Sequence, residues 1–364
     1  MFDRRLIINF DFFLLFVVIL VSFFGVVNLK SICTSSGGDV SPFFYKQIYW
    51  IIIGLCCLLI IININYLSII KYAYYFHVVT IVVLLFVLFF GKTIYGSQRW
   101  LSLGPISIQP SEITKITFIL ALAKFYTENI SQKAYILKDL FMPALLLLAT
   151  FLPIYFQPDL GTAGIILLIF IFMSFFVNIN KKTLFFIFST VLVLMPFFWF
   201  FLKDYQKNRV LVFLNPERDP LNTGYQVIQS KIAVGSGGFL GKGFMLGTQS
   251  QLRFLPEQHT DFVFSVWAEE WGFVACFFLL LLFFSIVYRG LAIAFESKNV
   301  YGSFLAIGIS ALFFWQISIN IFMTLGLFPV VGVPLPFFTY GGSSMLCSMF
   351  GIAFLLNISM RKFT

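Results

Sequence analysis

Charged residues are scarce in this chain of 364 residues. Only 11% are Asp, Glu, Lys or Arg, whereas 60% are hydrophobic, including 51 phenylalanines. A soluble globular domain carries about a quarter charged residues, so the scarcity excludes that class. The apolar residues gather in runs of about 20 separated by short polar joints, which predicts membrane-spanning helices. They do not alternate with polar residues as the strands of a membrane barrel do.

Cysteine and histidine are also few. Four of the five cysteines fall inside apolar runs, where a thiol behaves as a small hydrophobe, and Cys33 stands alone in a loop. Neither a disulfide framework nor a metal knuckle is predicted. The two histidines, His77 and His259, lack partners at metal-ligand spacing, so the residues predict no metal site.

Nucleotide-binding motifs are missing as well. The chain has no P-loop and no dinucleotide fingerprint. Its net charge of +9 comes from Lys and Arg scattered at the ends of apolar runs and not gathered into a basic stripe. No nucleic-acid partner is therefore expected.

The long apolar runs predict the fold class. They indicate an all-α integral membrane protein, a bundle of about ten transmembrane helices in a single polytopic domain over residues 1–364. The first run lacks a convincing small-x-small cleavage site, so it is expected to remain as a span. We expect the spans at residues 8–28, 46–64, 72–90, 111–126, 139–156, 161–178, 183–202, 262–288, 300–324 and 340–360.

The distribution of Lys and Arg orients this bundle. Twelve of them lie in loops on the side of the N-terminus, and four lie in the short loops on the other side. Because Lys and Arg are retained on the cytoplasmic side, both termini are expected to be cytoplasmic. Residues 203–260 then form a large extracytoplasmic loop between the seventh and eighth helices, and Asp261 faces the outside. Nucleotide triphosphates are not available there, so a reaction at this face needs a substrate that arrives already activated.

The segment GSQRWLSLGPISIQPSEITK, residues 96–115, leads into the fourth span. Glu112 and Lys115 are three residues apart, share one face of a helix and can pair. Ionisable residues within a span usually face a polar cavity or the bundle interior. Two interpretations stay open: a buried structural ion pair, or a lining for an anionic or sugar ligand. Arg99, beside Trp100, suits either a phosphate contact or a membrane-edge anchor.

Three further segments are rich in turn-forming residues. In QPDLGTAG, residues 157–164, Asp159 is either a helix cap or a second outer-face carboxylate. In the long loop, residues 225–234 have the apolar spacing of a helix. The glycines at 235–247 favour tight turns over a phosphate cradle, because no P-loop helix start accompanies them. Residues 323–344 lack Lys and Arg and are rich in Pro and Gly, which predicts a re-entrant or surface-lying segment.

The stretch FLPEQHTDFVFSVWAEE, residues 254–270, places Asp261 where the long loop enters the eighth span. An acidic residue at this position is a common N-cap. The same position near a helix N-terminus keeps a carboxylate ionised, as a general base requires. The residues alone favour the two roles equally.

Four stretches carry a resemblance to a known family. In chain order they are QPSEITK, DPLNTGYQVIQSKIAVGSGGFLGKG, GTQSQLRFLPEQHTDFVFSVWAEEWGF and LFPVVGVPLPFFTYGGSS. Over essentially the whole chain they resemble the SEDS family of shape, elongation, division and sporulation proteins. They are more similar to its rod-shape branch than to its division branch.

The resemblance implies a peptidoglycan glycosyltransferase that polymerises lipid II on the outer face of the bacterial cytoplasmic membrane during elongation. It also implies a class B penicillin-binding protein and the elongation machinery as partners. By motif, Asp261 matches the family's essential aspartate, and Glu112 and Lys115 match its intramembrane charged pair. The one cofactor to consider is a divalent cation, Mg²⁺ or Mn²⁺.

We therefore expect Asp261 to act as the catalytic base. Two rival functions remain: a lipid II flippase, which forms no bond, and a scaffold for the transpeptidase. The candidate substrate-binding residues are Arg99, Glu112, Lys115, Asp159, Lys231 and Lys242.

Overall fold

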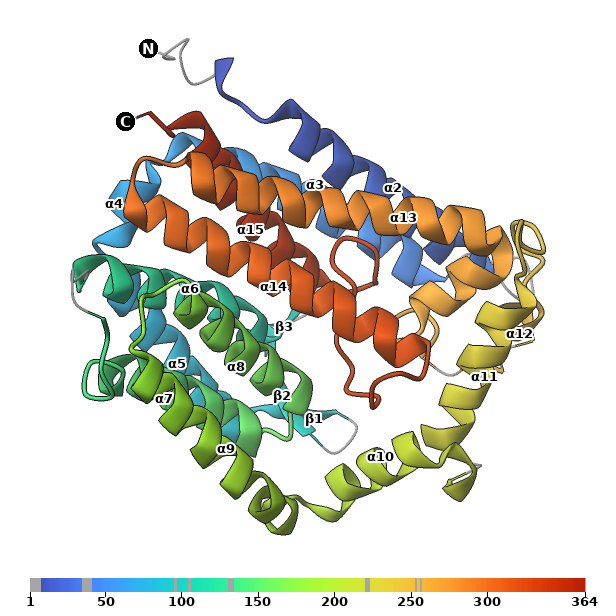
Figure 1. Ribbon diagram of the computed structural model, residues 1–364. Coiled ribbons are helices and arrows are strands. Elements are labelled where there is room, and N and C mark those ends of the chain that lie inside the picture. The colour runs from blue at the N-terminus through green and yellow to red at the C-terminus, as the bar shows by residue number, and fades with distance from the viewer. Residues whose placement is uncertain are drawn as a thin grey trace.

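The chain folds into a bundle of long helices (Figure 1). The computed structural model describes residues 8–34, 41–94, 97–103, 106–129, 134–219, 223–252, 254–255 and 257–363. Each of the ten ranges expected to span the membrane overlaps a helix, with ends that differ by up to eight residues. These helices are α2 (Phe12–Thr34), α3 (Pro42–Asn63), α5 (Ala73–Phe90), α6 (Pro110–Glu128), α7 (Phe141–Phe156), α8 (Leu160–Phe175), α9 (Lys181–Phe201), α13 (Val263–Glu296), α14 (Val300–Thr324) and α15 (Gly342–Met360).

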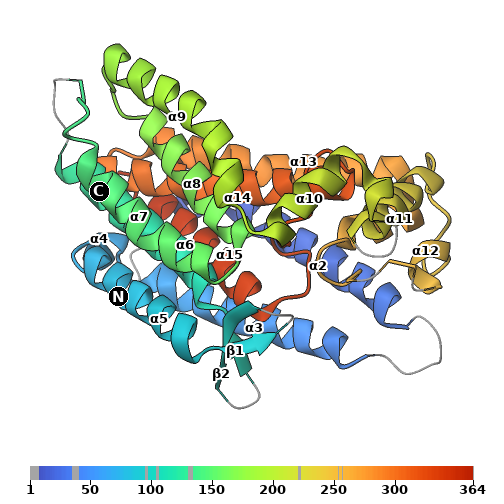
Figure 2. The ribbon, with the colours of Figure 1, turned by 90° about the horizontal axis from the view of Figure 1, so that it is seen from below.

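The predicted class, a helical polytopic membrane protein, is confirmed. Within the described ranges, six helices are long and apolar enough to cross a membrane: α2, α3, α5, α13, α14 and α15. Both termini lie at one end of the bundle, and α11 (Thr223–Ser236) and α12 (Thr248–Gln251) lie at the other (Figures 1 and 2). This arrangement agrees with the expectation that the two termini share one face of the membrane.

Helix α6 explains why the fourth span is weak by hydropathy. It packs against α5, α7, α8, α14 and α15, so nearly all of its faces meet protein and few meet lipid. Its charged residues Glu112 and Lys115 point into this interior and are both buried. A helix enclosed in this way can carry polar groups that a lipid-facing helix cannot, provided that they are paired.

A small sheet joins α5 to α6, where the sequence had predicted only an outer loop. Strands β1 (Lys92–Ile94), β2 (Ser97–Leu103) and β3 (Ile106–Ile108) form an antiparallel sheet in the order β1-β2-β3. Strand β2 packs against α5 and α6, and β3 packs against α15. Strands this short do not produce a recognisable alternation, so pattern analysis missed them.

The long loop at 203–260 contains secondary structure of its own. It holds α10 (Asp204–Leu214), a 3-10 turn η1 (Pro216–Arg218), α11 and α12. The helix predicted from the apolar spacing of residues 225–234 lies within α11 and is confirmed. Helix α10 was not predicted.

Helix α13 is broken at Gly272, and the glycine-rich part of the long loop fills the break. Gly272 has φ +73°, which interrupts the helical hydrogen-bond ladder and leaves amides and carbonyls without partners inside the helix. Residues 238–243 supply those partners. Four backbone bonds join the segments: Lys242 N–H to Glu269 O (3.0 Å), Gly243 N–H to Glu270 O (2.9 Å), Phe273 N–H to Gly238 O (3.0 Å) and Val274 N–H to Phe239 O (3.2 Å).

Glycine is required on both sides of this junction. Gly241 has φ +81°, a left-handed conformation that favours glycine. A Cβ on Gly241 would overlap the backbone of Glu270, and one on Gly272 would overlap the backbone of Gly241. Gly241 and Gly272 therefore allow the backbones of the loop and of α13 to approach closely. The glycines of the loop have this role in addition to the turns that the sequence predicted.

The segment between α14 and α15 packs into the bundle. Its residues Val333, Leu335, Phe337 and Phe338 are buried, in keeping with its lack of Lys and Arg. A Cβ on Gly25 of α2 would come 2.8 Å from Phe338 Cα, so this segment meets α2 at close range. These residues therefore belong to the packed interior of the bundle.

Candidate active site

Asp261 lies immediately before α13 without capping it. The helix begins at Val263, its N-cap is Phe262, and no side chain caps its first turn. The capping interpretation of Asp261 is therefore wrong. Its backbone is held from two sides: Asp261 N–H donates to Glu257 O (3.1 Å), and Asn320 Nδ2 donates to Asp261 O (3.3 Å).

The Asp261 carboxylate lies against Gly332 in the segment between α14 and α15. A Cβ on Gly332 would come 3.5 Å from Asp261 Oδ2, and Gly332 has φ +72°. Burial, aided by the negative charge of Glu257, raises the pKa of Asp261 to about 6, while Arg209 and Arg99 act to lower it. A carboxyl with a pKa in this range is mostly ionised at pH 7 and still basic enough to take a proton.

Arg99 is fastened to the turn between α7 and α8. Its Nε donates to Gln157 O (3.2 Å), its Nη2 donates to Pro158 O, and its Nη1 lies 3.7 Å from Asp159 Oδ1. A quarter of the Arg99 side chain is exposed. The guanidinium is therefore fixed by protein contacts and still presents surface to a ligand.

Asp159 has the capping role that was left open for it, and its role as an outer-face carboxylate near the site stays a prediction. It caps α8 by accepting from Thr162 N–H (3.3 Å). It also accepts from Gln109 Nε2 (3.0 Å) and Ser111 Oγ (3.4 Å), and it faces Arg99. The Asp159 carboxylate is thus held by several hydrogen bonds, and its charge helps to orient the Arg99 guanidinium.

Arg209 is a candidate that sequence reasoning missed. It projects from α10, is partly buried, and its guanidinium lies 6.0 Å from the ring centre of Tyr205. Burial and the charge of Arg99 lower its pKa, and the charges of Asp261 and Asp159 oppose that shift. In the described part of the chain no carboxylate forms an ion pair with Arg209. The run DYQKNRVLVFL, which forms α10, is the part of the sequence that could have indicated a helix carrying Arg209.

Glu112 and Lys115 form the predicted ion pair. Lys115 Nζ lies 2.7 Å from Glu112 Oε1, and the Lys115 side chain has 0% exposure. Cys347 Sγ donates to Glu112 O, which ties the pair to α15. Glu112 Oε2 is buried without a hydrogen-bond partner among the described residues. The pairing is confirmed, and a role in binding stays a prediction.

The two lysines of the long loop are placed differently from the other candidates. Lys242 Nζ donates to Glu269 Oε1 (2.6 Å) and to Thr248 Oγ1 (2.8 Å), so its charge is already compensated. Lys231 is exposed on α11 beside Gly326. No contact among the described residues joins either lysine to Asp261. Binding roles for these lysines remain predictions.

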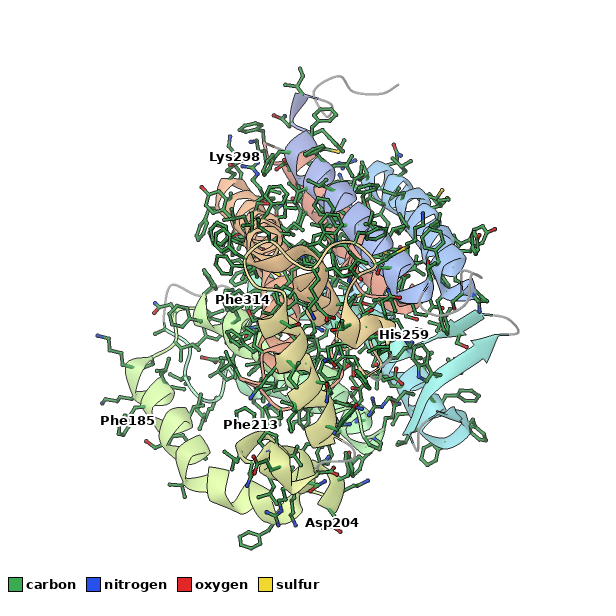
Figure 3. All side chains as sticks on the ribbon, turned by 90° about the vertical axis from the view of Figure 1, so that its right-hand side faces the viewer. Phe185, Asp204, Phe213, His259, Lys298 and Phe314 are labelled. Carbon is green, nitrogen blue, oxygen red and sulfur yellow. The ribbon has the colours of Figure 1, made fainter. Side chains whose placement is uncertain are left out.

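The rim of the site carries one histidine. The His259 ring stacks on Phe43 with centroids 5.1 Å apart, and its Nε2 lies 3.9 Å from Glu257 Oε2. Figure 3 looks onto this end of the bundle and labels His259 together with Asp204 and Phe213 of α10. Among the residues described, no group of three or more His, Cys, Asp or Glu could hold a metal ion.

Fold and site together define a polytopic membrane protein with a carboxylate and two arginines at one end of its bundle. The chain matches the FtsW/RodA/SpoVE family of cell cycle proteins over residues 10–363, and it belongs to that family. It is a multi-pass protein of the bacterial cytoplasmic membrane. The resemblance noted from the sequence motifs is confirmed.

Two relatives illustrate the match. The chain is 40% identical over 337 residues to a protein of Escherichia coli (strain K12) named peptidoglycan glycosyltransferase MrdB, covering 91% of this chain and 89% of that one. It is 31% identical over 430 residues to the Treponema pallidum protein named peptidoglycan glycosyltransferase RodA, covering 97% and 98%.

Solved structures agree in fold. A chain from a study of how a peptidoglycan synthase complex coordinates polymerization and crosslinking superposes with a TM-score of 0.84 at 33% identity, over 98% of this chain and 99% of that one. The rod shape determining protein RodA of Thermus thermophilus superposes with a TM-score of 0.72 at 27% identity, over 98% of each chain.

Proposed function

We propose that this chain is a peptidoglycan glycosyltransferase that polymerises lipid II on the outer face of the cytoplasmic membrane during cell elongation. The observation that supports it best is Asp261, whose backbone is held by a hydrogen bond just before α13 begins. Its carboxyl has a pKa of about 6, and the charges of two arginines act to lower that pKa. The names of its relatives support the same activity.

Asp261 acts as the general base. It takes the proton from the 4-hydroxyl of the acceptor GlcNAc, and the resulting oxygen nucleophile attacks C1 of the donor MurNAc. The new C–O bond forms as the bond to the pyrophosphate breaks, so the anomeric centre inverts and undecaprenyl pyrophosphate leaves. A base with a pKa close to the working pH suits this transfer.

Arg99 and Arg209 are the groups that we expect to steady the leaving pyrophosphate. A guanidinium presents paired donors that match phosphate oxygens, and both charges act on the pKa of Asp261. Lys115 is buried and paired with Glu112, so it fits a supporting role better.

We expect a divalent cation, Mg²⁺ or Mn²⁺, to enter with the pyrophosphate. Such ions are often held by one or two carboxylates together with substrate phosphates, and not by a cage of protein ligands. Glu257, at the rim of the site, is the carboxylate that would hold it, so that Asp261 stays free to take the proton, and the ion would supply charge neutralisation of the leaving group. Glu257 O accepts a hydrogen bond from Asp261 N–H (3.1 Å), which supports a cation held beside the base.

The partner that we propose is a class B penicillin-binding protein, within the elongation machinery, which cross-links the new strands. The support is the similarity to a chain from a peptidoglycan synthase complex that coordinates polymerization and crosslinking. Binding of purified transpeptidase to this chain in nanodiscs tests the pairing.

The test of the catalytic role is polymerisation of purified lipid II by the reconstituted protein carrying Asp261→Asn. We expect loss of glycan strands with an unchanged elution profile. The matched control is Asp204→Asn, an isosteric change at an exposed position of α10, which should retain activity. Wild-type strand formation by folded Asp261→Asn protein would show that Asp261 is not the base.

A lipid II flippase is the second candidate, because the broken helix α13 is a feature of many transporters. Here the break is filled by four backbone hydrogen bonds from the loop, which favours a fixed site over a moving gate. Lipid II supplied to one leaflet of a liposome distinguishes the two functions. Glycan product supports the enzyme, whereas translocation without product supports the transporter. A pure scaffold predicts instead that Asp261→Asn complements a null strain.

A further inference from the structure

The segment that fills the break in α13 exposes large apolar side chains. Phe239 is 67% exposed, Leu240 is 78% exposed and Leu246 is 64% exposed. Phe239 and Leu240 lie directly against the break, since a Cβ on Gly272 would meet the backbone of both, and Leu246 packs on Gly243 of the same segment. A contiguous apolar patch of this kind marks a contact with a membrane or a partner.

This patch continues the lipid-facing side of α13. The ring of Phe239 stacks on Phe273 with centroids 5.9 Å apart, and Phe273 stacks on Phe277 at 6.3 Å. Phe273 and Phe277 are both exposed on a helix that is long and apolar enough to span the membrane. Such a face contacts lipid. The stacked rings of Phe277, Phe273 and Phe239 therefore form a continuous apolar surface from the membrane span to the loop.

The depth of the junction can be worked out from the helix rise. Arg289 pairs with Asp11, directly before α2, at 2.6 Å. We take this ion pair as the cytoplasmic boundary, because charged groups lie at the ends of a span and the N-terminus is expected on that side. From Phe273 to Arg289 the helix advances 16 residues (289 − 273), or about 24 Å. The hydrocarbon core is about 30 Å thick, so Phe273 lies within its outer edge. Phe239, stacked on it, lies at the same depth.

Backbone groups of the segment at the junction are paired, as this environment requires. Gly238 O and Phe239 O accept from Phe273 N–H and Val274 N–H, so these carbonyls do not need water. Between residues 232 and 252 the only charged residue is Lys242, and its charge is paired with Glu269.

We propose that Phe239, Leu240 and Leu246 insert into the outer leaflet and anchor the long loop to lipid. The occupant is the acyl-chain and headgroup boundary of the bilayer, because the patch is continuous with the lipid-facing side of α13. The anchor fixes the depth of the junction at the outer edge of the hydrocarbon core, and therefore the height of the outer site over the membrane surface. A membrane-held substrate presents its polar group at that level.

Spin labels measure this directly. We would place them singly at Leu240→Cys and Leu246→Cys, with the five native cysteines replaced, in full-length protein in nanodiscs of phosphatidylethanolamine and phosphatidylglycerol. Phe277→Cys on α13 is the lipid reference, and exposed Glu217→Cys is the water reference. Collision rates with molecular oxygen, which enters lipid, are compared with those of a water-soluble nickel chelate.

The expected result is that both loop labels give an oxygen-to-nickel ratio close to that of Phe277→Cys. A ratio matching Glu217→Cys would overturn the proposal, because it would place the patch in water. Labels that are accessible to nickel in the isolated chain and become shielded only when purified transpeptidase is added would also overturn it, by making a protein the occupant. Both label positions are exposed, so the substitutions remove no buried contact.

Discussion

Lys242 Nζ lies 2.6 Å from Glu269 Oε1, and the Glu269 side chain has no exposed surface. Glu269 also accepts from Thr248 Oγ1 (3.0 Å) and Gln249 N–H (3.0 Å). The buried Glu269 carboxylate therefore binds the long loop to the first half of α13, the half that follows Asp261. This ion pair and the backbone junction at Gly272 together fasten the loop to α13 on both sides of the break.

The first prediction concerns that ion pair. Lys242→Met leaves the Glu269 charge buried without its partner, which should cost about 3 kcal/mol of stability. Adding Glu269→Gln removes the orphaned charge, so the double variant should be more stable than Lys242→Met alone. Thermal unfolding of the purified proteins in detergent measures both. Additive losses in the double variant would show that the pair does not couple loop and helix.

The second prediction is a pH dependence. Since burial raises the pKa of Asp261 to about 6, polymerisation should rise from pH 5 to pH 7 as the base becomes ionised. Arg209→Gln removes a charge that lowers this pKa and should move the midpoint upward, whereas Glu257→Gln should move it downward. Initial rates of lipid II polymerisation across pH measure the midpoint. Glu217→Gln is the control and should leave it unchanged.

The same pKa shift carries a third prediction, on stability. A carboxyl whose pKa is raised in the folded state binds its proton more tightly there than in the unfolded chain. This tighter binding of the proton stabilises the fold below the unfolded pKa, and the stabilisation is lost as pH rises through about 6. Asp261→Asn should therefore unfold at a higher temperature than the parent at pH 7, with a smaller difference at pH 4. An equal difference at both values would show that ionisation of Asp261 does not lower the stability of the folded protein.

The fourth prediction concerns the break in α13. Gly272→Ala forces a side chain into the backbone of Gly241 at a positive φ, which should cost about 2 kcal/mol or more and lower polymerisation. The matched control is Gly164→Ala in α8, where a Cβ would meet nothing within 4 Å. That change should be neutral or stabilise by about 0.5–1 kcal/mol. Melting temperatures and glycan yields that fall equally in both variants would argue against the junction.

The fifth prediction separates structure from binding at the intramembrane pair. Glu112→Gln or Lys115→Met alone should cost about 3–5 kcal/mol, because each leaves a buried charge unpaired. The double variant should recover most of that stability. We expect it to fold and yet to polymerise poorly in the lipid II assay. Full activity of the folded double variant would leave the pair a purely structural role.

The sequence predicted the helices well because their cause is local. A run of apolar residues must become a helix in hydrocarbon, where its backbone can be satisfied only internally, and each expected range overlaps an observed helix. The pair Glu112 and Lys115 was predictable for the same reason, since three residues of helix bring them together. The short strands of the sheet and α10 carried no comparable periodicity and were missed.

The candidate site was only partly predictable. Motifs drew attention to Asp261, but its role as a helix cap was excluded only by the observed start of α13 at Val263. Lys242 was a candidate phosphate contact, and only the structure showed that its charge is paired with Glu269. Arg209 entered the site because α10 brings it into the electrostatic environment of Asp261 and Arg99.

The sequence by itself determined that this is a membrane protein, where its helices lie and which residues merit attention, because hydropathy and helical spacing act over a few neighbouring residues. Only the tertiary structure decided which charges are compensated and which remain available. That outcome depends on contacts between distant segments, above all on the loop that fills the break at Gly272 and on the arginines that α10 and β2 bring toward one carboxylate.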